Sequence, residues 1–237
     1  MEFHIDNMWN GKPLTHTPMK VSIEPLKNGT VKVTASGILF NDLPSPPPVS
    51  PGCDGATDQL WDYEVVEVFF LNSADDTYLE VELGPYGHHL VLLLQGRRNI
   101  IKTMLPMKYQ VMSRTNDSWV AEAFIPIEYF PPNIDKLNAY AIHGSGEQRQ
   151  YQQRYPQTEN ITQPDFHRLQ DFGDVEFSTI IDSNSTRVYS AVWKESMAAN
   201  QFGTSRYRIL NSSRPFQLYS QRKTETLICL SRQILAP

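Results

Sequence analysis

The chain has 237 residues, 40% of them hydrophobic and 20% charged, which is the composition of an ordinary globular protein. No apolar run approaches a membrane span, and the first residues include acids and lack the apolar core of a signal peptide. The net charge is −5, with +6 over residues 183–237 and therefore −11 over residues 1–182, which argues against nucleic acid as a partner. Two cysteines, Cys53 and Cys229, do not make a disulfide framework, so we expect a cytoplasmic protein without a membrane partner.

The first predicted strands form a hairpin. Residues 19–24 and 30–36 are short alternating runs, and the Asn28-Gly29 pair between them is a strong hairpin signal. Residues 41–55, NDLPSPPPVSPGCDG, contain too much proline for a helix or a central strand. We expect an extended surface loop there, leading to Trp61.

Residues 60–94 predict three consecutive strands. The runs 65–70 and 78–83 are rich in β-forming residues, and a third run follows the turn at 84–87. In the second run apolar side chains alternate with a more polar set, Tyr78, Glu80 and Glu82. This period of two predicts a strand with one buried face.

The remaining runs extend the β pattern. Strands are predicted at 100–105, 109–113, 119–125, 137–143 and 172–177, and a short helical turn stopped by prolines at 127–130. About ten strands with almost no helical periodicity indicate an all-β fold, an antiparallel sandwich or barrel.

The composition changes after Asp182. Residues 1–182 are interpreted as one β-sandwich domain, and residues 183–237 as an atypical basic tail in which neither period persists. A last strand could lie at 189–193. The tail is either a regulatory or partner-binding segment or an irregular, splice-derived C-terminus, and we expect it to be irregular because such a segment cannot easily offset its ordering entropy.

Trp61 and Glu67 are the first candidates for a binding site. Trp61 is followed by Asp62, Glu64 and Glu67, and an aromatic plate beside hydrogen-bonding acids is typical of a carbohydrate site. Glu64 and Glu67 are three apart on a strand, so they point to opposite faces and one of them faces the core or a cleft. Core packing is the alternative role for Trp61.

Catalytic and metal-binding arrangements find less support in the spacing. Glu80 and Glu82 share one face of their strand, whereas a glycosidase needs two carboxylates that face each other across a cleft. The two glutamates could instead form the solvated side of that strand. His88 and His89 diverge on a strand, and His143 and His167 lie far away, so no metal-ligand spacing is present. We expect no metal and no cofactor.

Arg97 and Arg98 follow the third strand of the 60–94 segment. An arginine side chain can hold two hydroxyls or a carboxylate at once, and exposure at the surface is the alternative for both residues.

Several long stretches over residues 1 to about 180 closely resemble an uncharacterised metazoan family named after a human chromosome 4 open reading frame. The matching stretches are LWDYEVVEVFFLN, YLEVELGPYGHHLVLLLQGRRN, YFPPN, AIHGS and PDFHRLQDF. The tail from about Ser183 does not resemble that family.

The pattern is also remotely similar to family 9 carbohydrate-binding modules and the related DOMON sandwiches. The similar positions are Trp61, Asp62, Glu67, Tyr78, Glu80, Pro85 and Gly87, then Trp119, Ala121, Glu122, Ile125 and Pro126, and last Phe172, Gly173 and Phe177. In those modules two aromatic residues clamp the sugar while Glu and Arg bond its hydroxyls. This chain has Phe166 and His167 where the second aromatic is usually Trp, and His143 where the pattern often has Arg.

Together these patterns predict one antiparallel β-sandwich of jelly-roll type. We expect a cleft rimmed by seven residues: Trp61, Glu67, Arg97, Arg98, His143, Phe166 and His167. The leading hypothesis is a non-catalytic module that binds a carbohydrate or a similar small polyol. The alternatives are an enzyme that uses Glu67, His143 and His167 as acid/base or metal-binding groups, and a protein-interaction scaffold. The oligomeric state stays open.

Overall fold

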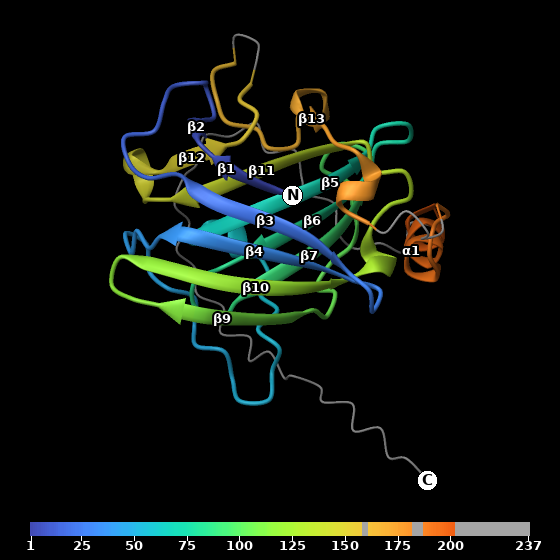
Figure 1. Ribbon diagram of the computed structural model, residues 1–237, viewed down its shortest axis with the longest axis horizontal. Helices are drawn as coiled ribbons and strands as arrows, with labels where there is room; N and C mark the ends of the chain where they lie inside the picture. The colour runs from blue at the N-terminus through green and yellow to red at the C-terminus, as the bar shows by residue number, and fades with distance from the viewer. Residues whose placement is uncertain (158–160, 182–186, 202–237) are drawn as a thin grey trace.

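The computed structural model describes residues 1–157, 161–181 and 187–201, and it contains two antiparallel sheets packed face to face (Figure 1). The first sheet has the strand order β1-β3-β4-β10-β9. Its strands are β1 (Glu2–Ile5), β3 (Met19–Leu26), β4 (Thr30–Ile38), β9 (Lys108–Arg114) and β10 (Ser118–Pro126).

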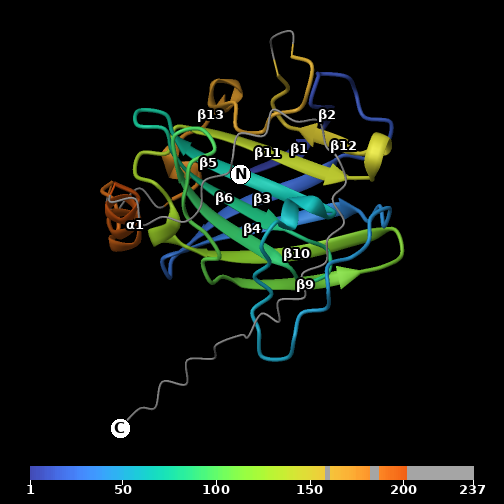
Figure 2. The same cartoon turned by 180° about the vertical axis from the view of Figure 1, so that it is seen from behind.

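The second sheet has the strand order β2-β12-β11-β5-β6-β7-β8, with β13 paired to β11 (Figure 2). Its strands are β2 (Asn7–Met8), β5 (Val65–Asn72), β6 (Thr77–Leu83), β7 (His89–Gln95), β8 (Ile100–Lys102), β11 (Lys136–His143), β12 (Gln150–Gln153) and β13 (Gly173–Asp174). The predicted antiparallel β-sandwich is therefore confirmed.

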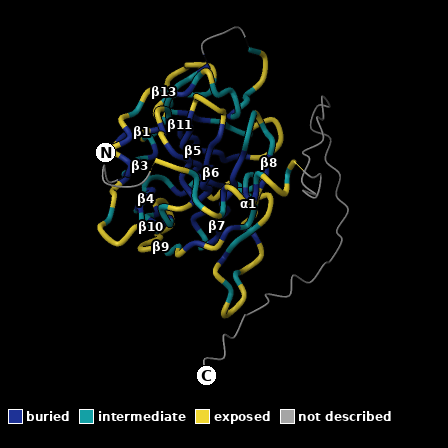
Figure 3. The backbone as a smooth tube through the Cα atoms, turned by 90° about the vertical axis from the view of Figure 1, so that its right-hand side faces the viewer, coloured by how far each residue is buried: buried dark blue, intermediate teal, exposed yellow. Residues whose placement is uncertain are grey.

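The two sheets differ in the solvent exposure of their outer faces. In the first sheet buried and partly exposed residues alternate along β3, β4 and β10, as expected for a sheet with one solvated face. In the second sheet every residue of β5 and β6 is buried, so both of its faces are covered (Figure 3). The outer side of β6 is thus not the solvated side that the alternation of Glu80 and Glu82 suggested.

The apolar core is consequently divided in two. The larger cluster fills the space between the sheets and includes Val68, Val81 and Trp119. A second cluster covers the outer face of the second sheet and joins Phe69, Tyr78 and Tyr140 of the strands to residues of distant loops, among them Leu60, Phe166 and Phe172. These loops exclude water from a face that would otherwise be the surface of the sandwich.

Turns follow the local sequence signals. Gly29, in the predicted hairpin between β3 and β4, has φ +74°, a left-handed conformation that Asn-Gly turns favour. The proline-rich segment 41–55 forms no helix or strand, as expected. Short 3-10 helices complete the loops: η1 (Leu60–Asp62), η2 (Ile127–Tyr129), η3 (Gly146–Gln148), η4 (Leu169–Asp171) and η5 (Phe177–Thr179).

The C-terminal described segment differs from the expectation. The structure has a helix, α1 (Ala191–Gln201), where a strand was predicted at 189–193, and the strand predicted at 172–177 is reduced to the two residues of β13. Trp193 is fully buried, and its Nε1–H donates to the carbonyl oxygen of Tyr129 at 3.0 Å. The rest of the predicted tail, residues 183–186 and 202–237, lies outside the described residues. No helix in the described part of the chain is long and apolar enough to cross a membrane.

Candidate functional site

The candidate site lies on the outer face of the second sheet. Along β5, Val66, Val68 and Phe70 enter the core between the sheets, so Glu67 and its alternate neighbours face outward. The register then brings acids together, because Glu67 lies directly opposite Glu82 of β6, and Glu80 precedes Glu82 by two residues on the same face.

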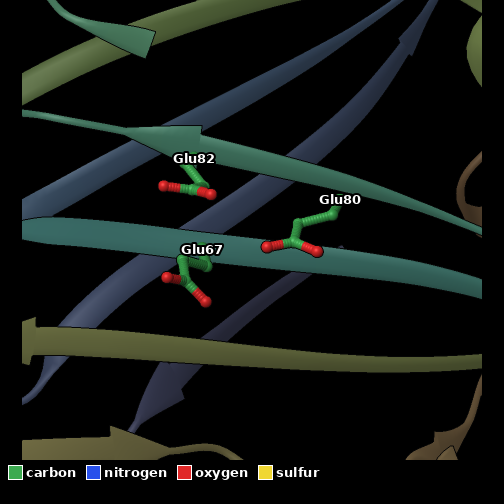
Figure 4. A group of neighbouring side chains, drawn as sticks. All are labelled: Glu67, Glu80 and Glu82. Atoms are coloured by element: carbon green, nitrogen blue, oxygen red, sulfur yellow. The ribbon is translucent and has the colours of Figure 1, made fainter. Parts of the chain in front are cut away.

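The carboxylates of Glu67, Glu80 and Glu82 form one cluster. Each offers an oxygen, and these three oxygens lie within 4.8 Å of one another (Figure 4). The side chains are at most 3% exposed. Like charges directly opposite each other on neighbouring strands are unfavourable, and burial in an apolar face makes them more so.

Burial dominates the electrostatics of this cluster. It raises the pKa of Glu67 to about 8, and the positive charge of Arg149 only partly opposes this rise. Burial and the neighbouring carboxylates also raise the pKa values of Glu80 and Glu82 well above their ordinary value. Three adjacent carboxylates therefore cannot all be ionised at neutral pH without a positive partner.

Hydrogen bonding does not satisfy the cluster. Both carboxylate oxygens of Glu82 and Oε2 of Glu80 are buried and have no partner among the described residues, unless the two side chains share a proton. Glu64, in contrast, accepts hydrogen bonds from the backbone N–H groups of Phe40 and Asn41 at 3.0 and 2.9 Å. Buried polar groups in native proteins are nearly always paired, so this exception calls for an explanation.

One rim of the site is formed by η1 and the residues around β12. Trp61 is half-buried and packs against the outer apolar cluster together with Tyr151. The guanidinium of Arg149 donates to the carbonyl oxygen of Trp61 and, at 3.2 Å, to that of Asp62. Arg149 thus ties η1 to the segment before β12 and supplies positive charge near Glu67.

A second rim is formed by residues 165–172, and it meets the first where the rings of Phe166 and Tyr151 lie edge to face, with 5.8 Å between centroids. The ring of Phe166 stacks on Tyr140 with 3.9 Å between centroids, and the hydroxyl of Tyr140 donates to the carbonyl oxygen of Phe166 at 2.8 Å. His167 lies beside Tyr78, with 2.8 Å between Nδ1 and the hydroxyl oxygen.

A hydrogen-bond chain fixes the tautomer of His167. The backbone N–H of Arg98 donates to the Tyr78 hydroxyl at 3.1 Å, so that hydroxyl uses its own proton to donate to Nδ1 of His167. Nδ1 is therefore an acceptor, and Nε2 carries the proton of the neutral ring. Burial, reinforced by the positive charge of Arg98, lowers the pKa of His167 to about 3.

Arg97 and Arg98 are both paired within the protein. Both guanidinium groups bond Asp165, Arg98 with 2.8 Å between Nη2 and Oδ1. Burial opposes ionisation of Asp165, but the hydrogen bonds from the two arginines leave its pKa below the ordinary value. The pair thus anchors the 165–168 loop over the second sheet.

His143 lies on the other face. It follows Ala139 and Ala141, which enter the core between the sheets, and its Nδ1 is 2.8 Å from Oδ2 of Asp42. Phe40 stacks on its ring with 3.5 Å between centroids. Burial lowers the pKa of His143, although Asp42 opposes this shift.

The structure thus brings six of the seven predicted residues to one side of the second sheet and not the seventh. Glu67 lies in the centre, and the others belong to the two rims or to the loop that anchors the second rim: Trp61, Arg97, Arg98, Phe166 and His167. His143 is directed elsewhere. Sequence reasoning did not single out Arg149 or Tyr151, whose spacing carries no signal. It considered Glu80 and Glu82 as catalytic or solvated acids, and Glu80 also as one of the positions similar to the carbohydrate-binding modules.

Comparison with known proteins identifies relatives over most of the chain. No protein-family model matches. The mouse "UPF0462 protein C4orf33 homolog" is 45% identical over 199 residues, 81% of this chain and 100% of the mouse protein. The human "UPF0462 protein C4orf33" is 42% identical over 81% of this chain and 96% of the human protein. The zebrafish homolog is also 42% identical, over 81% of this chain and 98% of its own length.

One solved structure shares the fold. A Bacteroides uniformis protein, described as "a putative carbohydrate-binding protein", matches 73% of this chain and 84% of its own with a TM-score of 0.54. The sequences are 17% identical, so the likeness shows a common architecture.

Proposed function

This chain belongs to the UPF0462 family, and from that premise and its fold we propose that it is a non-catalytic binding module for a carbohydrate or polyol-like small ligand. The recognition surface in this proposal is the partly exposed part of the outer face of the second sheet, at Trp61 and Tyr151 of the apolar cluster that covers the carboxylates. The fold shared with the Bacteroides protein supports the class of function, and the residues of this chain support the location.

One observation carries the proposal: buried, underused hydrogen-bond acceptors lie beside partly exposed aromatic side chains. Glu80 and Glu82 provide the unpaired acceptors with Glu67 beside them, and Trp61 and Tyr151 are among the partly exposed aromatics of the surrounding apolar cluster. A sugar offers an apolar C–H face to an indole ring and hydroxyl donors to carboxylates, so it needs both features.

The arrangement fits binding better than glycoside hydrolysis. A glycosidase places its acid and its base on opposite sides of the bond that it cleaves. Here the three carboxylates come from neighbouring positions on a single sheet face and are at most 3% exposed, so a glycosidic bond does not fit between two of them. The alternative enzyme also needs His143 together with Glu67 and His167, and the Asp42 contact directs His143 to a different part of the molecule.

Titration of the full chain with a panel of mono- and oligosaccharides, followed by tryptophan fluorescence, tests the proposal. We expect saturable binding that Trp61→Ala and Glu67→Gln each weaken at least tenfold. Phe124→Ala is the matched control, because it removes a partly exposed aromatic ring from the outer face of the other sheet. Failure of the folded chain to bind any saccharide, or equal affinity in Trp61→Ala, would refute the proposal.

A further inference from the structure

The buried carboxylate cluster presents a charge problem that its surroundings do not solve. Among the residues that the structure describes, Arg149 and Arg98 are the ones that bring positive charge to bear on it, on Glu67 and Glu80 respectively. Both guanidinium groups make their hydrogen bonds elsewhere, Arg149 with the carbonyl groups of η1 and Arg98 with Asp165. Neither guanidinium forms an ion pair with Glu67, Glu80 or Glu82.

Unpaired atoms provide the second observation. Glu82 is fully buried, and neither of its carboxylate oxygens has a partner among the described residues; Oε2 of Glu80 is in the same state. Figure 4 shows the carboxyl groups of the three residues gathered over β5 and β6. An isolated buried carboxylate is costly, so the unpaired oxygens of Glu80 and Glu82 on β6, which lie beside the Glu67 carboxylate of β5, indicate a cationic occupant.

From these two observations we propose that Glu67, Glu80 and Glu82 bind a hard divalent cation, Ca²⁺ in preference to Mg²⁺. Carboxylate oxygens are the ligands of such ions, and Ca²⁺ takes them at about 2.3–2.6 Å. Oxygens on opposite sides of a Ca²⁺ ion are then about 5 Å apart. The three oxygens lie within 4.8 Å of one another, close enough to reach one such ion. Mg²⁺ usually keeps several water ligands, for which this buried cluster leaves less room than for an ion held mainly by protein oxygens.

The cation would stabilise the fold at the pairing of β5 with β6. It would join β5 to β6 through Glu67 and Glu82 and would neutralise charge beneath the loops that cover the second sheet. The site needs no saccharide, so the inference stands or falls separately from the proposed binding function.

The test uses the full chain after treatment with a chelator, titrated calorimetrically with CaCl₂, MnCl₂ or MgCl₂ in the absence of any saccharide. We expect one Ca²⁺ per chain, weaker Mg²⁺ binding, and a rise of the thermal midpoint by about 5–10 °C at a concentration 100 times the dissociation constant. Glu82→Gln keeps the size of the side chain and should weaken Ca²⁺ binding at least tenfold. Glu24→Gln is the control, since Glu24 is exposed on β3.

Two results would overturn the inference: no heat of binding with any of the three salts, or equal Ca²⁺ affinity in wild type and Glu82→Gln. The former would leave a proton shared between Glu80 and Glu82 as the occupant. If Glu82→Gln does not fold, anomalous scattering from wild-type crystals soaked in MnCl₂ decides the matter. A peak among the three carboxylates supports the site, and a peak only elsewhere refutes it.

Discussion

His89 gives the sharpest prediction about stability. Its side chain is fully buried between the sheets, edge-on to the ring of Tyr109, and neither ring nitrogen has a hydrogen-bond partner among the described residues. Burial lowers its pKa from 6.5 to about 4; Asp54 opposes that shift, and the neighbouring His88 adds to it. The folded protein therefore holds this imidazole neutral where the unfolded chain protonates it.

The sign and the size follow from proton linkage. Above pH 6.5 His89 is neutral in the folded and the unfolded state, so its protonation does not reduce the free energy of unfolding. Below pH 6.5 the unfolded state takes up a proton first, so the free energy of unfolding falls until about pH 4, where the folded state is protonated as well. At pH 4.5 the loss from this histidine alone amounts to about 2.5 kcal/mol. His89→Leu removes the titrating group and should remove that part of the pH dependence.

Urea unfolding at pH 7.5 and pH 4.5 measures the effect. We expect the wild type to lose about 2.5 kcal/mol more than His89→Leu between the two pH values, while the control His4→Gln, which removes an exposed histidine, behaves as wild type. Comparing the change with pH cancels any packing defect that Leu introduces. Equal pH dependence in wild type and His89→Leu, within about 0.5 kcal/mol, would refute the reasoning.

Three further substitutions test individual contacts by urea unfolding. Trp193→Ala removes the buried anchor of α1 and should cost about 3–5 kcal/mol; a loss below about 1 kcal/mol would show that α1 does not belong to the core. Tyr78→Phe leaves Nδ1 of His167 without its donor and should cost about 1–3 kcal/mol, whereas an unchanged midpoint would contradict that bond. Arg97→Ala should change stability by less than about 1 kcal/mol, because a side chain that is 54% exposed gains little from its ion pair with Asp165; a larger loss would contradict this account.

The strands could be predicted because their signal is local. Alternation with a period of two identified β3, β4 and β10, and the Asn28-Gly29 pair identified the hairpin before β4. The expected sandwich follows from these runs and from the scarcity of helical patterns. Each of these inferences needs only neighbouring residues and general backbone geometry.

The environment of Glu80 and Glu82 could not be predicted in the same way. Alternation tells which residues share a face, but it does not tell whether that face meets water. Here loops that are distant in the sequence and include Leu60 and Phe166 cover the outer face. Their packing against the sheet depends on tertiary contacts, which local alternation does not reveal. The direct opposition of Glu67 and Glu82 likewise depends on the register between β5 and β6.

The helix α1 was missed because its signal is short. Val192, Trp193, Ser196 and Met197 share one helical face, but the segment is only eleven residues long and has few large apolar side chains. The burial of Trp193 stabilises it, and that contact is made with a different part of the chain. His143 was placed in the predicted cleft because it stands where the carbohydrate-binding-module pattern often has Arg, and the sequence does not tell which face of the strand its side chain occupies.

Hydrogen exchange of the full chain, with and without a saturating mixture of mono- and oligosaccharides, tests most directly whether the outer face of the second sheet is a recognition surface. The account predicts slower exchange around residues 60–63, 149–151 and 165–168, with no change in β3 and β4 of the first sheet. Unchanged exchange throughout, or protection confined to the first sheet, would contradict it.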